Sequence, residues 1–396
     1  MRGFLLTLFS VLILSGLTYC RTDNFATIKT GAERTHVYLP VLKGKKIGIV
    51  ANHTSLVNDV HLVDTLLKEG IDVERIFSPE HGFRGNRDAG EYVSNYTDRK
   101  TGLEVVSLYG KRKKPKLKDL DDLDIVVFDI QDVGVRFYTY ISTLHYVMEA
   151  CAKTNTKLIV FDRPNPNGFY IDGPVLREEQ KSFVGKHPIP IVHGMTVAEL
   201  ARMINGENWL GEDVQCDLEW VKCANYTHDS LYELPVKPSP NLPNMRSVYL
   251  YPSLGLFEGT VMSVGRGTEF PFQVYGHPDM KKKSFSYKPR SLDGFSSNPK
   301  YKDRRCYGKD LRNLSIDSLI RNPGINLSWL KSSYKQFETS GDFFLSFFHN
   351  LVGNTRLQGF IENGRSVSEI KKSWQKELDQ FARKREKYLL YEDFTQ

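Results

Sequence analysis

Short motifs that identify nucleotide-dependent, zinc-dependent or esterase chemistry are missing from this sequence. No G-x-G-x-x-G follows the apolar segment 46–52 and no Walker loop occurs, which disfavours a dinucleotide cofactor and nucleotide hydrolysis. No G-x-S-x-G elbow, Cys-x-x-Cys pair or histidine-rich spacing is present either. We therefore expect chemistry that uses no metal and no other cofactor.

The chain also has few cysteines, five in 396 residues. Apart from Cys20, they are Cys151, Cys216, Cys223 and Cys306. In an exported protein this even number permits disulfides, and Cys216 and Cys223 are close enough in sequence to pair across a hairpin. Cys151 lies in an apolar pattern of helical period, which predicts a buried thiol.

Long apolar runs are confined to the N-terminus. Arg2 is followed by an apolar run over 4–14, so residues 1–20 are typical of a secretory signal peptide. A permanent membrane span would need about 20 apolar residues. We therefore expect export to the periplasm or cell envelope. Two alternatives remain for Cys20: a lipidated cysteine that tethers the protein to a membrane, against which the bulky Tyr19 argues, or ordinary cleavage nearby.

Acidic residues are outnumbered, and the net charge is +7 at pH 7. Much of the excess lies in the runs 111–114 and 281–283, which usually form solvated loops. A basic surface also suits an anionic polymer. Nucleic acid is not an expected partner, because an exported chain without an aromatic-basic recognition motif has none of its usual signatures.

Apolar strands and helical patterns alternate in the first half of the chain. Strands are predicted at 46–52, 73–77, 105–108, 125–129 and 158–162, and helices at 60–69, 140–153 and 197–205. Continuous apolar strands separated by helices indicate a parallel α/β sheet, so we predict a Rossmann-like domain over 21–245. Aromatic and glycine-rich segments and a long helix over 367–391 indicate a smaller C-terminal α+β domain over 246–396.

Each of four predicted strands is followed by a polar loop. The loops are 52–54, 78–82, 129–132 and 162–166. Ligands of open α/β sheets bind beyond the carboxyl ends of the strands, so we expect these loops to converge on one cleft. They contribute the candidate binding residues Asn52, His53, His81, Asp129, Gln131, Arg163 and Asn165.

Carboxylates in these loops are the candidates for proton transfer. Glu80 could act as a general acid if burial raises its pKa, or it could cap backbone amides. Asp129 and Asp132 could bind sugar hydroxyls or share acid and base roles, although Asp132 could instead cap the following helix. Glu258, near the predicted domain junction, is the second carboxylate considered for catalysis.

Three arginines are candidates for holding an anionic group. Arg136 follows Gly134 in a predicted loop, and Arg163 and Arg266 lie directly beside proline and glycine. A guanidinium binds a carboxylate through two hydrogen bonds. An internal Arg–Asp pair is the alternative for any of them, for instance Arg163 with Asp129 or Asp162. His193, before a predicted helix that Thr196 caps, and Asn241, in a proline-rich turn, complete the candidate set.

Taken together, these motifs resemble those of one family, the exo-β-N-acetylmuramidases of the NamZ type. The resemblance covers the chain from about residue 27 onward. It rests on segments 78–85, 129–140, 162–166, 182–185, 193–196, 238–241, 258–260, 265–268, 373–374 and 388–391.

The resemblance implies a cleft between two domains and release of N-acetylmuramic acid from the non-reducing end of peptidoglycan fragments, without a metal or nucleotide. In that chemistry Glu80 is our choice for the acid, with Glu258 or Asp132 as the partner. Arg136, Arg163 or Arg266 would bind the lactyl carboxylate of the substrate, a peptidoglycan-derived muramyl saccharide. The alternatives are a non-catalytic envelope protein that binds muropeptides and a related hydrolase of other specificity.

Overall fold

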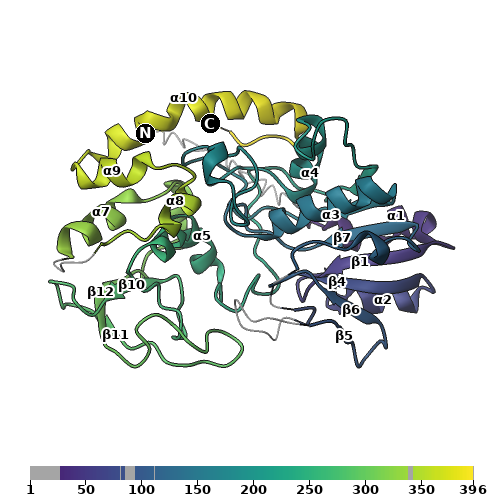
Figure 1. Ribbon diagram of the computed structural model, residues 1–396, viewed down its shortest axis with the longest axis horizontal. Helices are drawn as coiled ribbons and strands as arrows, with labels where there is room; N and C mark the ends of the chain where they lie inside the picture. Colours follow the sequence, from purple (N-terminus) through teal and green to yellow (C-terminus); the bar gives the residue numbers. More distant parts are fainter. Residues whose placement is uncertain (1–26, 81, 85–93, 111, 338–341, 396) are drawn as a thin grey trace, which may run out of the picture.

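The computed structural model describes residues 27–80, 82–84, 94–110, 112–337 and 342–395 (Figure 1). The predicted signal peptide, Cys20 and His81 lie outside the described residues. Two lobes are joined side by side: an N-terminal lobe, residues 27–244, and a C-terminal lobe, residues 245–395.

A seven-stranded sheet forms the centre of the N-terminal lobe, in the order β5-β6-β4-β1-β7-β8-β9. Neighbouring strands are parallel except for β5 and β6. Without the short β5, the parallel strands follow the order 3-2-1-4-5-6 of a Rossmann sheet. The strands are β1 (Lys46–Ala51), β4 (Asp72–Ser78), β5 (Tyr96–Thr97), β6 (Glu104–Ser107), β7 (Ile125–Asp129), β8 (Lys157–Phe161) and β9 (Leu218–Val221).

Helices cover both faces of this sheet. The helices α1 (Thr35–Leu42) and α2 (Leu62–Lys68) pack on one face, and α3 (Tyr140–Thr154) and α4 (Val197–Gly206) pack on the other. Alternate strand residues face the two sides, which is why the strands are almost wholly apolar. The Rossmann-like α/β prediction is therefore confirmed.

In the N-terminal lobe, each predicted element matches an observed one to within one or two residues at either end. The largest difference in the N-terminal lobe lies at 60–69, where the helix begins only at Leu62. The two preceding residues pair as β3 (Val60–His61) with β2 (Leu56–Val57) in a small hairpin. The predicted cap of α4 is confirmed, because the Thr196 side chain accepts a hydrogen bond from the Glu199 amide.

The C-terminal lobe is the smaller α+β unit that the sequence predicts. An antiparallel sheet has the order β10-β12-β11, formed by β10 (Val274–His277), β11 (Ser286–Tyr287) and β12 (Cys306–Asp310). Helices pack around it and against the N-terminal lobe. They are α5 (Met245–Leu254), the 3-10 turn η4 (Gly255–Gly259), α6 (Ile316–Arg321), α7 (Leu327–Gln336), α8 (Phe347–Val352), α9 (Arg356–Glu362) and α10 (Val367–Arg385).

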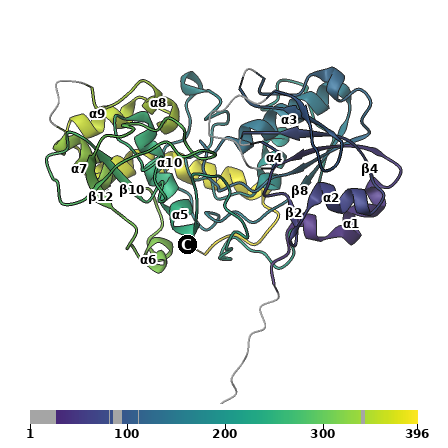
Figure 2. The same ribbon diagram turned by 90° about the horizontal axis from the view of Figure 1, so that it is seen from below.

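The last helix, α10, runs across both lobes (Figures 1 and 2). Its buried stripe Ile370, Trp374, Leu378 and Phe381 confirms the predicted apolar face. The helix ends at Arg385 rather than near 391, because the chain tightens into a 3-10 turn whose Tyr388 and Leu389 carbonyls accept hydrogen bonds from Arg202 of the other lobe.

The cysteines at 151, 216, 223 and 306 are all free and buried, so the suggested pairing of Cys216 with Cys223 is wrong and the buried Cys151 is confirmed. Cys216 and Cys223 pack in different places: Cys216 belongs to the larger hydrophobic core, whereas Cys223 Sγ lies 3.3 Å from the Asp162 carbonyl. In the part of the chain that the structure describes, no helix is long and apolar enough to cross a membrane.

Candidate active site

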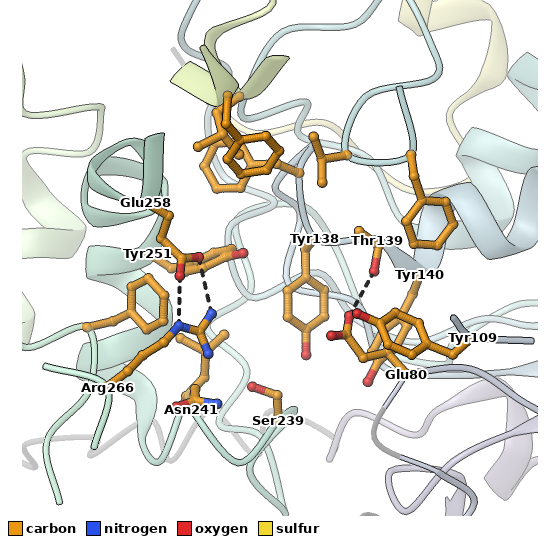
Figure 3. Close-up of a pocket in the computed structure, with 17 residues that line it drawn as sticks. Glu80, Tyr109, Tyr138, Thr139, Tyr140, Ser239, Asn241, Tyr251, Glu258 and Arg266 are labelled. Carbon is orange, nitrogen blue, oxygen red and sulfur yellow. Dashed lines mark hydrogen bonds and ion pairs between the residues drawn. The ribbon is translucent and has the colours of Figure 1, made fainter. Parts of the chain in front are cut away.

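A pocket lies between the two lobes (Figure 3). The N-terminal lobe contributes the residues that follow β4 and β6 and the start of α3. The C-terminal lobe contributes α5, η4 and the segment that precedes β10. The polar and ionisable side chains of the lining are Glu80, Tyr109, Tyr138, Thr139, Tyr140, Ser239, Asn241, Tyr251, Glu258 and Arg266.

Glu80 enters the pocket from the end of β4. Thr139 Oγ1 lies 3.4 Å from its Oε2, and Tyr109, from the end of β6, hydrogen-bonds to the same carboxylate. Burial, followed by the charge of Glu80, raises the pKa of Tyr109 well above its ordinary value, so the phenol stays protonated as a donor. Two hydroxyl donors therefore orient Glu80.

Glu258 and Arg266 face Glu80 from the other side of the pocket (Figure 3). Arg266 donates from Nε to Oε1 at 2.7 Å and from Nη2 to Oε2 at 3.1 Å. Gly265 and Gly267 both have a φ of +79°, so the chain turns tightly around Arg266. The guanidinium also lies 5.0 Å from the centroid of the Phe272 ring. This two-point contact fixes the Glu258 carboxylate in one orientation.

Aromatic rings form the wall between the two carboxylates. Tyr251 is in edge contact with Phe137, Tyr138 and Phe272, at centroid distances of 5.3, 5.8 and 5.0 Å. Asn241, on the pocket floor, donates from Nδ2 to the Phe295 carbonyl at 2.9 Å, and its buried Oδ1 has no partner among the described residues. The pocket thus combines flat apolar surfaces with a hydrogen-bond acceptor, Asn241 Oδ1, and this combination suits a sugar ring with an amide substituent.

The loops expected to converge on this cleft lie in two layers. The 78–82 loop reaches the pocket through Glu80, and the loop after β7 reaches it only through residues 137–140. The other polar loops bind one another beneath it. Arg163 donates to both oxygens of Asp129, at 2.6 and 2.9 Å, and to the Leu56 carbonyl. This pair is 2% and 0% exposed, so the internal pairing considered for Arg163 is what the structure shows.

Neighbouring candidates in this lower layer are also engaged by the protein itself. Asn52 Oδ1 accepts from the Thr54 amide at 2.9 Å and from its hydroxyl at 2.6 Å, and Gln131 Nε2 donates to the Asp132 and Pro164 carbonyls. The buried Asp132 caps the Gly134 amide at 2.7 Å, and burial raises the pKa of its carboxyl to about 7. Asn52, Gln131 and Asp132 are not among the described residues that line the pocket.

Arg136 is fully buried and binds four backbone carbonyls instead of a carboxylate. Its Nη1 donates to Pro174 and Ile189, and its Nη2 donates to Leu351 and Val352, at 2.7 to 2.9 Å. The first two carbonyls belong to the N-terminal lobe and the last two to α8 of the C-terminal lobe. The contacts of Arg136 therefore join the lobes below the pocket.

The remaining candidates lie outside the described pocket lining. His53 Nε2 lies 2.8 Å from the Lys237 carbonyl. His193 is 1% exposed, and its Nδ1 accepts a hydrogen bond from the Met195 amide. Burial lowers the pKa of His193 to about 3. Asn165 donates to the Met195 carbonyl and packs so closely on Gly134 that a Cβ there would lie 2.1 Å from its Oδ1. Of the candidate residues, Glu80, Asn241, Glu258 and Arg266 share the pocket.

Two family models together match nearly the whole described chain. Residues 47–246 match the N-terminal domain of the exo-β-N-acetylmuramidase NamZ, and residues 249–391 match its C-terminal domain. The chain belongs to the NamZ family.

Similar proteins support this membership. The peptidoglycan β-N-acetylmuramidase NamZ of Bacillus subtilis (strain 168) is 40% identical over 372 residues, which cover 89% of each chain. A DUF1343 family protein from Bacteroides fragilis NCTC 9343, solved at 1.30 Å, has a TM-score of 0.87 and 47% identity, over 93% of this chain and all of its own. A second from the same strain, at 1.65 Å, has a TM-score of 0.78 and 28% identity, over 92% and 99%.

Several pocket residues of this NamZ-family chain were not candidates in the sequence. Tyr109 follows β6 and would have been found by applying the strand-end rule to that strand as well. Tyr138, Thr139 and Tyr140 end the 129–140 segment, from which the sequence analysis selected mainly the charged residues that precede them. Tyr251 lies within α5, where no local signal distinguishes it from a core aromatic residue. Among the described residues, no group of His, Cys, Asp and Glu is placed to hold a metal ion.

Proposed function

We propose that this protein is an exo-acting glycoside hydrolase that releases N-acetylmuramic acid from the non-reducing end of peptidoglycan fragments. The observation that carries the proposal is the pocket of this NamZ-family chain, where two glutamates lie on opposite sides of a space lined by aromatic rings. Glycoside hydrolysis ordinarily needs a pair of carboxyl groups on either side of the scissile bond, and the presence of Glu80 and Glu258 on opposite sides of one pocket supports the proposal.

Glu80 is the proposed general acid. It protonates the glycosidic oxygen as the bond to the anomeric carbon breaks, so the leaving sugar departs as a neutral alcohol. A water molecule supplies the hydroxyl that the anomeric carbon gains and gives up its proton to a carboxylate. The hydroxyls of Tyr109 and Thr139 orient the carboxyl group for this transfer.

Glu258 is the proposed second carboxylate. Arg266 holds both of its oxygens, so one orientation is maintained toward the anomeric centre, where positive charge develops. Asp132 is the less favoured partner, because its Oδ1 is taken by the Gly134 amide and it lies behind the described lining.

Arg266 also supplies the proposed contact to the lactyl carboxylate that distinguishes muramic acid. Of the three candidate arginines, it is the one that lines the pocket. Its Nε and Nη2 bind Glu258, and the described residues offer no hydrogen-bond partner to Nη1. That nitrogen is therefore available for a substrate carboxylate.

We also propose export, with residues 1–20 as the signal peptide, and lipidation of Cys20 is the alternative to ordinary cleavage nearby. The support is the sequence pattern alone. Cell fractionation, together with fatty-acid labelling of the parent and Cys20→Ser proteins, tests both parts. Label that persists without Cys20 would exclude lipidation at that residue.

A panel of chromogenic β-glycosides tests the proposed activity. We expect the purified protein to release chromophore from the N-acetylmuramic acid glycoside and not from the glucose or N-acetylglucosamine glycosides. Release from none of them, with retained binding of muropeptides, would favour the second candidate, a non-catalytic muropeptide-binding protein. Release from another glycoside alone would show a related hydrolase of different specificity.

A further inference from the structure

A groove rich in basic residues lies beside the catalytic pocket. Its charged lining consists of Arg112, Lys113, Lys114, Lys116, Lys153 and Glu149. Five cationic side chains therefore face a single carboxylate among the groove's described residues, and we call this surface the basic groove. No step of the proposed hydrolysis uses it.

Elements that line the pocket continue into the groove. The chain that follows β6 passes from Tyr109 in the pocket to Arg112–Lys116 in the groove. Helix α3 begins in the pocket at Tyr140 and carries Tyr146 about 9 Å further along its axis, at 1.5 Å per residue. Phe183 lines the pocket and lies nearly parallel to Tyr146, with 6.3 Å between centroids and 9° between planes.

Two ammonium groups are held on this pair of rings. Lys113 Nζ lies 4.4 Å from the centroid of Phe183, and Lys186 Nζ lies 4.4 Å from that of Tyr146. Cation–π attraction restricts these long side chains, so a bound anion would cost them less entropy. Partial burial lowers the pKa of Lys186, because its ammonium group has lost part of its hydration.

The charges of the groove are only partly neutralised. Glu149 pairs with Lys114 at 3.2 Å and with Lys153 at 2.7 Å, and Arg112 pairs with Asp119 just outside the lining. Lys113 and Lys116 of the groove, and Lys186, which lies over the ring of the lining residue Tyr146, have no carboxylate within ion-pair distance among the residues that the structure describes. These three are therefore the cations that an external anion would meet.

We propose that the basic groove binds the continuation of the substrate, a peptide-free glycan chain that carries a carboxylate on every second sugar. The inference rests on the proposed function, because a chain of alternating N-acetylmuramic acid and N-acetylglucosamine has that charge pattern. With its non-reducing end in the pocket, such a chain passes Phe183 and Tyr146 and places its next lactyl groups among the lysines. Longer chains are then better substrates than the disaccharide, and added salt reduces the advantage.

The test compares chain lengths in a groove variant. In Lys113→Gln/Lys116→Gln/Lys186→Gln we expect the ratio of kcat/KM for long glycan strands to kcat/KM for the disaccharide to fall by about tenfold, since each exposed charge contact contributes a few-fold. The matched control is Lys43→Gln/Lys45→Gln/Lys68→Gln. These exposed lysines lie at the amino ends of the strands, the edge opposite Glu80, and the ratio should be unchanged.

An unchanged ratio in the groove variant would overturn the proposal, whether kcat/KM stays constant or falls equally for both substrates. Binding to vesicles of anionic phospholipid that is lost in the variant, with an unchanged ratio, would assign the groove to a membrane surface instead. If the parent releases nothing from any substrate, the proposed function fails by itself. Co-sedimentation with glycan strands, lost in the groove variant and kept in the control, would still support the groove.

Discussion

At the scale of single residues, burial separates the candidates that reach the substrate from those that support the fold. Arg163 and Arg266 both bind a carboxylate through two hydrogen bonds, but only Arg266 lines the pocket. The sequence shows glycine or proline beside each of them and cannot show which one is enclosed. Glu80 was predictable because a strand end followed by Pro79 and Gly82 places it at the ligand edge of the sheet.

Asp132 gives a prediction that depends on burial alone. Its carboxyl has a pKa of about 7 in the folded protein, raised from an ordinary value of 3.8. Between about pH 4 and pH 7 the folded state retains a proton that the unfolded chain has lost, so its ionisation costs stability as the pH rises through this window. The free energy of unfolding of Asp132→Asn, relative to that of the parent, should therefore rise by about 2 kcal/mol or more when the pH is raised from 5 to 8.

Urea denaturation of both proteins at the two pH values measures this gain. The parent and the variant should differ little in their pH dependence outside the window. An identical difference in unfolding free energy at pH 5 and pH 8 would show that Asp132 does not change its protonation there.

At the scale of elements, the sequence predicts what is local and misses what depends on a partner. Apolar continuity placed β1, β4, β6, β7 and β8, because burial on both faces of the sheet leaves a signal in each strand. The end of α10 was missed, because the turn after Arg385 is held by Arg202 from a distant part of the chain. The sequence also did not predict that some polar loops reach the pocket while others bind one another beneath it, because the Asp129–Arg163 pair that holds the lower loops is a tertiary contact.

Arg136 joins elements of both lobes, so its loss should be a stability defect. Arg136→Met removes a cation from four buried carbonyls and should cost about 3 kcal/mol or more. Arg136→Lys should recover part of the loss, because an ammonium group reaches fewer of the acceptors. Chemical denaturation of the three proteins measures the effect, and a cost below about 1 kcal/mol for the Met variant would contradict this account.

At the scale of the whole molecule, the two lobes share one hydrophobic core. The larger cluster extends from Val50 and Phe128 in the parallel sheet to Leu254 in α5 and Phe381 in α10. Lys371 and Trp374 of α10 also bind Asp172 of the N-terminal lobe, at 2.7 and 3.3 Å. The pocket lies between lobes that cannot separate without exposing this core, which keeps Glu80 and Glu258 in register.

Because the core is continuous, both lobes should unfold together. We expect a single calorimetric transition, and Trp374→Ala should shift the whole transition to lower temperature, since truncating a buried aromatic residue costs about 3–5 kcal/mol. Two transitions, of which Trp374→Ala moves only one, would instead show lobes that are stable independently.

The most direct test of the central claim is release of free N-acetylmuramic acid from the β-linked MurNAc–GlcNAc disaccharide. The mature parent protein is compared with Glu80→Gln, after thermal denaturation has shown that both are folded. The account predicts release by the parent and a rate reduced by about 10²–10⁴-fold in the variant, the usual contribution of a general acid, with binding of the disaccharide retained. Equal release by the two proteins would contradict the assignment of Glu80 as the acid.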